Sequence, residues 1–199
     1  MSKATVDFYF DFSSPYSYIA SCLIEKVCED NDTELRWQPL VIGGLFKSNN
    51  TTPPFTIPNR ARYMAADLES LAGFYGIPYK QRTHFLFSPI LALRATLAAS
   101  PEGERGKAVH ALFHGAWAKD LDLGDQEVAT GLLNDAGLNG ATLVERTKDD
   151  TIKSELRGNT DRADGLGIFG APFSVVNEGE KMFWGHDRLE LLGHYLASA

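Results

Sequence analysis

The chain has 199 residues, a length that fits one domain or one small domain carrying a large insertion. Its hydrophobic fraction of 44% and charged fraction of 23% are ordinary for a globular protein and exclude a disordered or fibrous chain. The net charge of −7 argues against nucleic acid as a partner, although a local basic cluster could still bind an anionic small molecule.

The first forty residues predict a β-α-β unit. Residues 6–10 are aromatic and apolar, which is typical of a short buried strand. Ser14 followed by Pro15 predicts a helix start with Ser14 as the N-cap, and residues 33–40 alternate in polarity as a second strand. Because a helix connects the two strands, we expect them to be parallel and joined by a right-handed crossover.

The two cysteines, Cys22 and Cys28, fall in the helix that starts at residue 15. They stand about 9 Å apart along the helix axis and point in different directions, so we expect no disulfide between them. Residues 1–5 lead into the first strand without a signal-peptide pattern, and no apolar run approaches the roughly 20 residues of a membrane span. We therefore expect a cytoplasmic protein without a membrane partner.

The middle of the chain predicts a loop followed by helices alone. Residues 41–59 are rich in Gly, Asn, Thr and Pro, and a loop of this length inside a compact protein is usually functional. From residue 60 to about 165 the sequence shows helical patterns, without a strand pattern or an internal repeat. The predicted helices cover residues 63–74, 90–99, 106–117, 125–136 and 142–156, with a short one at 160–165.

Strand patterns return near the end of the chain. Residues 173–176 and 181–184 predict two strands joined by a hairpin turn, and Asp187 would cap a last helix. The order β-α-β, helical block, β-β-α resembles an α/β thioredoxin-like fold with a large all-helical insertion, the DsbA-like arrangement. The predicted domains are a discontinuous thioredoxin-like domain, residues 1–42 and 167–199, and a helical insertion domain, residues 43–166.

Ser14 and Ser17 stand at the start of the first helix, where thioredoxin-like enzymes place Cys-Pro-x-Cys. Without sulfur at these positions, dithiol–disulfide chemistry is excluded at this motif. A helix N-terminus still presents free N–H groups and a partial positive charge, which favour an anion. A hydroxyl there can donate to the thiolate of a cosubstrate; the alternative is that Ser14 only caps the helix.

Two further positions carry both a structural and a functional interpretation. Pro172 at a strand entrance can be purely structural, or it can form a cis-proline loop that leaves the backbone of Ala171 free to pair with a peptide-like ligand. Asp187, with Glu190 three residues later, fits a capping box. Alternatively, Asp187 and the helix start would hold the α-carboxylate and α-amine of a ligand.

Basic residues and histidines are further candidates, the first for an anion site and the second for a metal site. The basic residues after the predicted loop form either an anion site or a solvated helix face: Arg60, Arg62, Lys80 and Arg82. His110 and His114 have an i, i+4 spacing that metal sites use. No third ligand accompanies them, so we expect no metal.

Short motifs along the whole chain carry a family resemblance. In chain order they are VDFYFDFSSPYSY at 6–18, the Pro-Pro pair at 53–54, PNRARYM at 58–64, DL at 67–68, GIP at 76–78, FGAP at 169–172 and WGHDRL at 184–189. With these motifs the chain resembles the 2-hydroxychromene-2-carboxylate isomerases and the kappa-class glutathione transferases. Both are glutathione-using groups of the DsbA-like thioredoxin superfamily.

The resemblance implies a role for each matching position. Ser14 would be catalytic, donating a hydrogen bond to the glutathione sulfur and favouring its thiolate. Ala171, beside a cis Pro172, would pair with the cysteinyl backbone of glutathione. Asp187, with His186 at the same helix start, would bind the γ-glutamyl end.

The glycyl end of glutathione is where this sequence departs from the family pattern. Arg60 occupies the place of a family Lys that contacts the glycyl carboxylate region, and Arg offers the same charge with a different geometry. The family often has Asn two residues before the Pro-Pro pair. Here Thr51 stands at that position and Asn50 is one residue earlier, so either could make the contact.

The resemblance implies a glutathione-dependent isomerase of the 2-hydroxychromene-2-carboxylate type, in aromatic compound catabolism, and a homodimer. Glutathione would be the cofactor and an aromatic-derived carboxylate electrophile the substrate: the thiolate adds, a bond rotates and glutathione is eliminated. One alternative is a kappa-class-like glutathione transferase acting on another electrophile, and another is a non-catalytic thioredoxin-fold binding module. The side chains that could line an apolar acceptor pocket are Phe12, Tyr16, Phe46, Tyr63, Phe85, Phe87 and Trp184.

Overall fold

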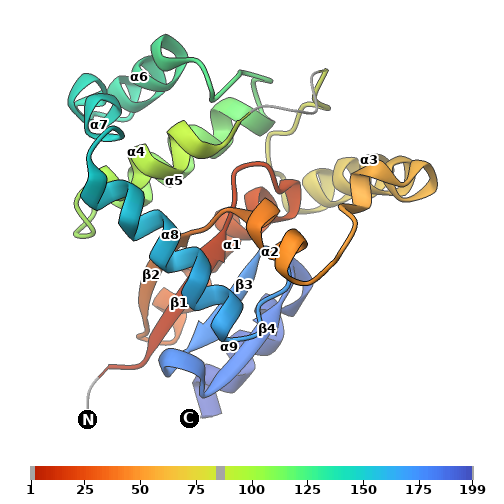
Figure 1. Ribbon diagram of the computed structural model, residues 1–199. Helices are drawn as coiled ribbons and strands as arrows, with labels where there is room; N and C mark the ends of the chain where they lie inside the picture. The colour runs from red at the N-terminus through yellow and green to blue at the C-terminus, as the bar shows by residue number, and fades with distance from the viewer. Residues whose placement is uncertain (1–2, 84–87, 199) are drawn as a thin grey trace.

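The computed structural model describes residues 3–83 and 88–198 (Figure 1). At its centre lies a four-stranded sheet in the order β2-β1-β3-β4. The strands are β1 (Thr5–Phe10), β2 (Glu34–Pro39), β3 (Phe173–Val176) and β4 (Lys181–Trp184). β1 is parallel to β2 and antiparallel to β3, and β3 is antiparallel to β4. Strands from both ends of the chain therefore share one sheet, which confirms the predicted thioredoxin-like topology.

Helices cover both faces of this sheet. In chain order, the described helices are α1 (Pro15–Asp30), α2 (Ile42–Ser48), α3 (Pro58–Tyr75), α4 (Ile90–Ala98), α5 (Glu104–Trp117), α6 (Gln126–Asp135), α7 (Gly140–Arg146), α8 (Asp150–Gly165) and α9 (Leu189–Ser198), and only some of them lie on the sheet. Phe8 and Phe10 of β1 pack in the core that α1, α5 and α9 share. Tyr9 points to the opposite face, where α2 and α8 cover it, and Figure 1 shows α8 crossing the sheet there. Burial on both faces explains why β1 is a continuous apolar run.

The helical segment packs directly on the loop that follows β1. The rings of Phe12 and Phe113 of α5 lie 4.6 Å apart, and the indole N–H of Trp117 donates to the carbonyl of Phe12 at 2.9 Å. One buried core cluster contains residues of the sheet, of α1 and of α4 to α7. The division into a thioredoxin-like domain and an insertion domain stays a prediction.

Residues 41–59 are not all loop, contrary to the sequence-based expectation. They contain α2 and a 3-10 turn, Pro54–Thr56. Gly43 and Gly44 lower the helical signal of α2, and Val41 at its N-cap offers no capping side chain. The missing cap comes from a distant residue, because the carboxylate of Asp11 accepts a hydrogen bond from the backbone N–H of Ile42 at 2.9 Å.

The predicted boundaries of the last insertion helices were wrong. The structure ends α7 at Arg146 and starts α8 at Asp150, where the sequence pattern ran one helix through both. Thr147 closes the last turn of α7 by donating its hydroxyl to the carbonyl of Val144 at 2.7 Å. Asp149 then adopts an extended conformation, and one helix runs through the predicted short helix at 160–165.

Asp187 does not cap the last helix. It lies inside a 3-10 turn, His186–Arg188, that precedes α9, and its carboxylate accepts a hydrogen bond from Arg188 at 2.7 Å. The predicted capping box with Glu190 is therefore absent, and the Asp187 side chain remains about half exposed. The hairpin turn predicted at 177–180 is also a 3-10 turn, Asn177–Gly179.

Candidate active site

Ser14 lies where the loop after β1 becomes α1. It is the N-cap, as predicted: its Oγ accepts a hydrogen bond from the backbone N–H of Ser17 at 3.2 Å. The same hydroxyl donates to the carbonyl of Ala171 at 3.0 Å, across 157 residues of sequence. Ser17 differs, because its hydroxyl is buried without a hydrogen-bond partner among the described residues. Ser14 is therefore the hydroxyl of this motif that reaches the site.

Hydrogen bonds to the Asp11 side chain fix the conformation of the loop that carries Ser14. The carboxylate is fully buried and accepts three hydrogen bonds, from the Ser13 backbone N–H at 2.8 Å, the Ser13 hydroxyl at 2.7 Å and the Ile42 N–H. Burial raises the pKa of Asp11, and its hydrogen bonds act in the opposite direction. No role was predicted for Asp11, although a charged residue directly after a buried strand was a signal available in the sequence.

The loop before β3 forms the opposite wall. The peptide bond between Ala171 and Pro172 is cis, as the resemblance implied. The carbonyl of Pro172 accepts a hydrogen bond from the backbone N–H of Gly185 at 3.1 Å, which ties this loop to the end of β4. The rings of Phe169 and Trp184 meet edge to face with centroids 4.7 Å apart and both remain partly exposed.

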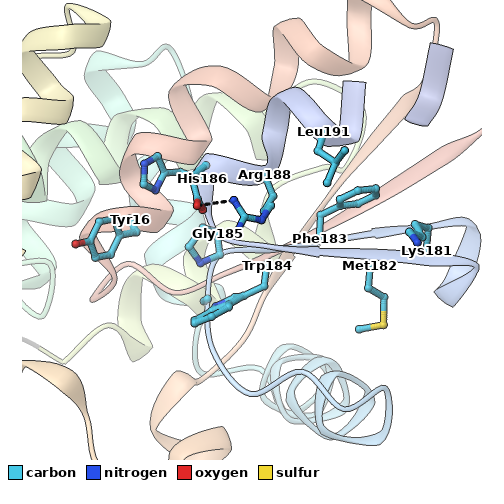
Figure 2. A pocket seen from close by; sticks show the side chains of 12 residues that line it. Tyr16, Lys181, Met182, Phe183, Trp184, Gly185, His186, Arg188 and Leu191 are labelled. Carbon is cyan, nitrogen blue, oxygen red and sulfur yellow. Dashed lines mark hydrogen bonds and ion pairs between the residues drawn. The ribbon is translucent and has the colours of Figure 1, made fainter. Parts of the chain in front are cut away.

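Two cavities meet at this point. The first, of about 580 Å³, is largely apolar and lies between α1, α2, α3 and the loop before β3. The second, of about 600 Å³, lies along β4 and the turn after it. Figure 2 shows the second cavity, with the rings of Tyr16 and His186 at one end and Lys181 and Met182 at the other. Tyr16, Ala171 and Trp184 line both cavities, so an elongated ligand could occupy the two together.

The structure divides the predicted site residues between the cavities. Ser14, Thr51, Arg60 and Ala171 line the apolar one. Ala171 also lines the second, together with Pro172, His186 and Asp187. Asn50 lines neither; it is exposed and adopts a left-handed conformation with φ of 49°.

Tyr16 connects α1 to two other elements. Its ring stacks on that of His186, with centroids 5.4 Å apart and 10° between the planes. Its hydroxyl donates to the Oδ2 of Asp67 on α3 at 2.8 Å. Burial lowers the pKa of His186, while the carboxylates of Asp187 and Asp67 act in the opposite direction. Asp67 belongs to the DL motif at 67–68, and the resemblance implied no function for it.

The aromatic residues expected around an acceptor divide into three groups. Those that line the apolar cavity are Tyr16, Phe46, Tyr63 and Trp184, joined by Phe55 and Phe169, which were not predicted. The expectation for Phe12 was wrong, because this ring is fully buried in the core against Phe113. Phe85 and Phe87 lie outside the described residues.

Arg62 and Arg82 do not join Arg60 in one anion site. Arg82 is buried and donates to the carbonyls of Ala116 and Leu121, at 2.8 and 3.1 Å, so its role is structural. Arg62 is exposed and bonds to the side chain of Asn59 on its own helix. His110 pairs with Glu25 at 2.9 Å, and the described part of the chain holds no cluster of three residues suited to a metal ion.

The chemistry open to this site follows from these positions. In the first turn of α1, Pro15 has no N–H and the N–H groups of Ser17 and Tyr18 bond to Ser14, so among the described residues the N–H of Tyr16 is the one left without a partner. The partial positive charge of the helix start favours an anion beside Ser14. A hydroxyl donor at the same point is suited to a thiolate, and the cavities on either side offer an apolar and a more polar compartment. The fold and the site thus define a thioredoxin-like protein that keeps the anion-binding geometry without the dithiol.

Comparison with known proteins agrees with that class. The family model of the DSBA-like thioredoxin domain matches residues 5–197, and the chain belongs to this family. The chain also belongs with the 2-hydroxychromene-2-carboxylate isomerases and kappa-class glutathione transferases. It is 31% identical to 2-hydroxychromene-2-carboxylate isomerase of Sphingobium xenophagum over 96% of this chain and 97% of the relative. It is 28% identical to human glutathione S-transferase kappa 1, over 96% and 90% of the two chains.

The fold itself is similar to that of a solved isomerase. The structure of a 2-hydroxychromene-2-carboxylate isomerase superposes with a TM-score of 0.86 at 23% identity, covering 98% of this chain and 95% of the other. Within the described residues, none of the helices has the length and hydrophobicity needed to cross a membrane.

Proposed function

We propose that this protein is a glutathione-dependent isomerase of the 2-hydroxychromene-2-carboxylate type, acting on an aromatic-derived carboxylate electrophile. The observation that carries the proposal is the Ser14 hydroxyl, which lies at the N-terminus of α1 in the wall of the apolar cavity and is bonded to Ala171, a residue that lines both cavities. A helix start alone would suit many anions. The relatives named isomerase and transferase make the glutathione thiolate the anion that fits best.

The polar and charged groups of the site suit the parts of a glutathione molecule. His186 and Asp187 in the second cavity would hold the γ-glutamyl end, and Arg60 in the apolar cavity would attract the glycyl carboxylate. Thr51 is a better candidate than Asn50 for the remaining polar contact, because only Thr51 lines the cavity.

Bound glutathione would supply the thiolate that adds to the electrophile, permits rotation about the former double bond and leaves again. Ser14 would turn its single O–H from the carbonyl of Ala171 toward the sulfur, keeping its acceptor bond from Ser17. The carbonyl of Ala171 would then be free to accept a peptide N–H of the ligand. Ser14 therefore changes partners without leaving a buried polar group unpaired, and the positive end of the α1 dipole, with the backbone N–H of Tyr16, would stabilise the negative charge.

A kappa-class-like transferase is the second candidate, supported by the human relative. It needs the same thiolate site and differs in whether glutathione stays on the product. The homodimer implied by the resemblance stays a prediction.

The first experiment is calorimetric titration with reduced glutathione of the wild type and Ser14→Ala. We expect binding between micromolar and low-millimolar affinity to both proteins. The pKa of the bound thiol, followed by thiolate absorbance, should be higher in the variant by roughly one to two units, because a charge-assisted hydrogen bond contributes about 1.5–3 kcal/mol. Absence of binding to the wild type would overturn both enzyme proposals and favour a non-catalytic binding module.

A second experiment separates the two enzyme proposals. The protein is incubated with 2-hydroxychromene-2-carboxylate and a sub-stoichiometric amount of glutathione. Isomerisation predicts that many substrate molecules turn over for each glutathione and that the free thiol is recovered. Loss of free thiol in step with the electrophile would instead show net conjugation, as a transferase requires.

A further inference from the structure

Among the residues that the structure describes, few side chains of α3 are buried and few polar contacts hold this helix over the apolar cavity. This helix contributes Arg60, Tyr63 and Met64 to the cavity wall. Of its 18 residues only Leu68 and Ala72 are buried. Apolar packing therefore gives little energy to fix α3 against the rest of the molecule.

One polar contact compensates for this weak packing. Among the described residues, the hydrogen bond from Tyr16 to Asp67 is the one side-chain hydrogen bond or ion pair that joins α3 to another element. It is partly buried and 2.8 Å long, and Asp67 itself lines neither cavity. The Oδ1 of Asp67 lies 3.4 Å from the hydroxyl of Tyr63, one turn earlier on the same helix.

Tyr16 is a firm anchor for such a bond. It belongs to the first turn of α1, two residues after Ser14, and its ring is held flat against His186. A bond to Tyr16 therefore fixes the position of the Asp67 carboxylate relative to the start of α1, where the thiolate would bind.

We propose that Asp67 is a positioning residue: through Tyr16 it fixes α3, so that Arg60 and Tyr63 keep their places in the wall of the cavity. This inference rests on the proposed glutathione site for its functional consequence. Its structural part concerns α3 alone and holds whatever the ligand is. Asp67 acts here as a hydrogen-bond acceptor, and the role does not require its charge.

The first test needs no ligand. Hydrogen–deuterium exchange is measured on segment 58–75 of the whole protein, for wild type, Tyr16→Phe, Asp67→Ala and Asp67→Asn. Tyr16→Phe removes only the hydroxyl, and Asp67→Asn keeps a carbonyl oxygen that can accept it. We expect faster exchange in α3 for the phenylalanine and alanine variants, by roughly 2- to 10-fold, with α5 unchanged and with near-wild-type exchange for Asp67→Asn.

The control is Ser70→Ala on the same helix. Its hydroxyl bonds only to the carbonyl of Ala66 within α3, so its loss should leave the exchange of the segment unchanged. Equal exchange in wild type, Tyr16→Phe and Asp67→Ala would overturn the positioning role. Failure of Asp67→Asn to restore slow exchange would also overturn it, since the charge would then be the essential property.

The second test links the bond to the site. We expect the Kd for reduced glutathione to rise roughly 2- to 10-fold in Tyr16→Phe and Asp67→Ala, and their double variant to be no weaker than the worse single one. The pKa of the bound thiol should not change, because Ser14 and the start of α1 are intact. Additive losses of affinity would contradict the proposal. If wild type binds no glutathione, the proposed function fails and the exchange experiment still decides the role of Asp67.

Discussion

Asp11 follows β1 directly, and its carboxylate is fully buried beneath the site. Both of its oxygens accept hydrogen bonds in a fully buried place, and they connect the Ser13–Ser14 loop to the start of α2. In Asp11→Asn, one oxygen becomes an NH₂ group that faces a backbone N–H. We expect the free energy of unfolding to fall by about 1–3 kcal/mol in urea titration, because a buried donor loses its acceptor. Asp161→Asn, at an exposed position of α8, is the matched control and should change stability by less than about 0.5 kcal/mol.

The same variant makes the pH dependence of Asp11 measurable. Burial raises the folded-state pKa of this carboxyl above its unfolded value, so the native state binds the proton more tightly than the unfolded chain. The stability that Asp11 contributes is therefore greatest below the unfolded pKa and declines as pH rises through the raised folded value. The difference in unfolding free energy between wild type and Asp11→Asn should shrink as pH increases across that window. A difference that grows with pH would mean that the hydrogen bonds outweigh burial.

Single residues also show which features of the site the sequence can predict and which it cannot. Ser14 was predictable because an N-cap is a local feature that Ser followed by Pro announces. Asp67 and Tyr16 are 51 residues apart, and no local pattern says that they meet. Asp187 was placed at the correct turn, yet its capping role was wrong because Arg188 engages its carboxylate instead.

At the scale of elements, periodicity predicted the strands and most of the long helices, but it misplaced the boundary between α7 and α8 and missed α2. Gly43 and Gly44 of α2 allow a matched test of why the sequence pattern did not predict this helix. A Cβ at Gly43 would meet nothing within 4 Å, whereas one at Gly44 would lie 3.2 Å from the methyl group of Thr160. We expect Gly43→Ala to stabilise the protein by roughly 0.5–1 kcal/mol in thermal or urea unfolding, since alanine loses less backbone entropy than glycine in a helix.

Gly44→Ala is the control for that gain. The same entropic benefit should be offset by crowding against Thr160 on α8, leaving stability unchanged or lower. Equal gains in stability at both positions would show that Thr160 on α8 can move away from the new methyl group at little energetic cost. No gain at Gly43 would contradict the entropic argument, because the lower entropy of the unfolded alanine chain should stabilise α2 however its tertiary contacts fix it.

At the scale of the whole molecule, the order of elements was enough to predict the fold, because the β-α-β and β-β-α segments form one sheet in few ways. The sequence could not show how the helical block meets the site. That contact is made by Trp117, whose indole N–H bonds to the carbonyl of Phe12, and by the pair of rings Phe12 and Phe113. Through this contact α5 packs against Phe12, which precedes Ser14 by two residues in the sequence.

This contact predicts that the two parts of the chain unfold together. Trp117→Phe leaves the buried carbonyl of Phe12 without its donor and opens a small void, so we expect a loss of about 2–4 kcal/mol in urea titration. Trp184→Phe, at an indole that is 54% exposed, is the matched control and should cost less than about 1 kcal/mol. Far-UV circular dichroism and tryptophan fluorescence should report one coincident transition in wild type and in both variants. Two separate transitions would show that residues 43–166 fold as an independent unit, in which case the loop carrying Ser14 would not depend on α5 for its position.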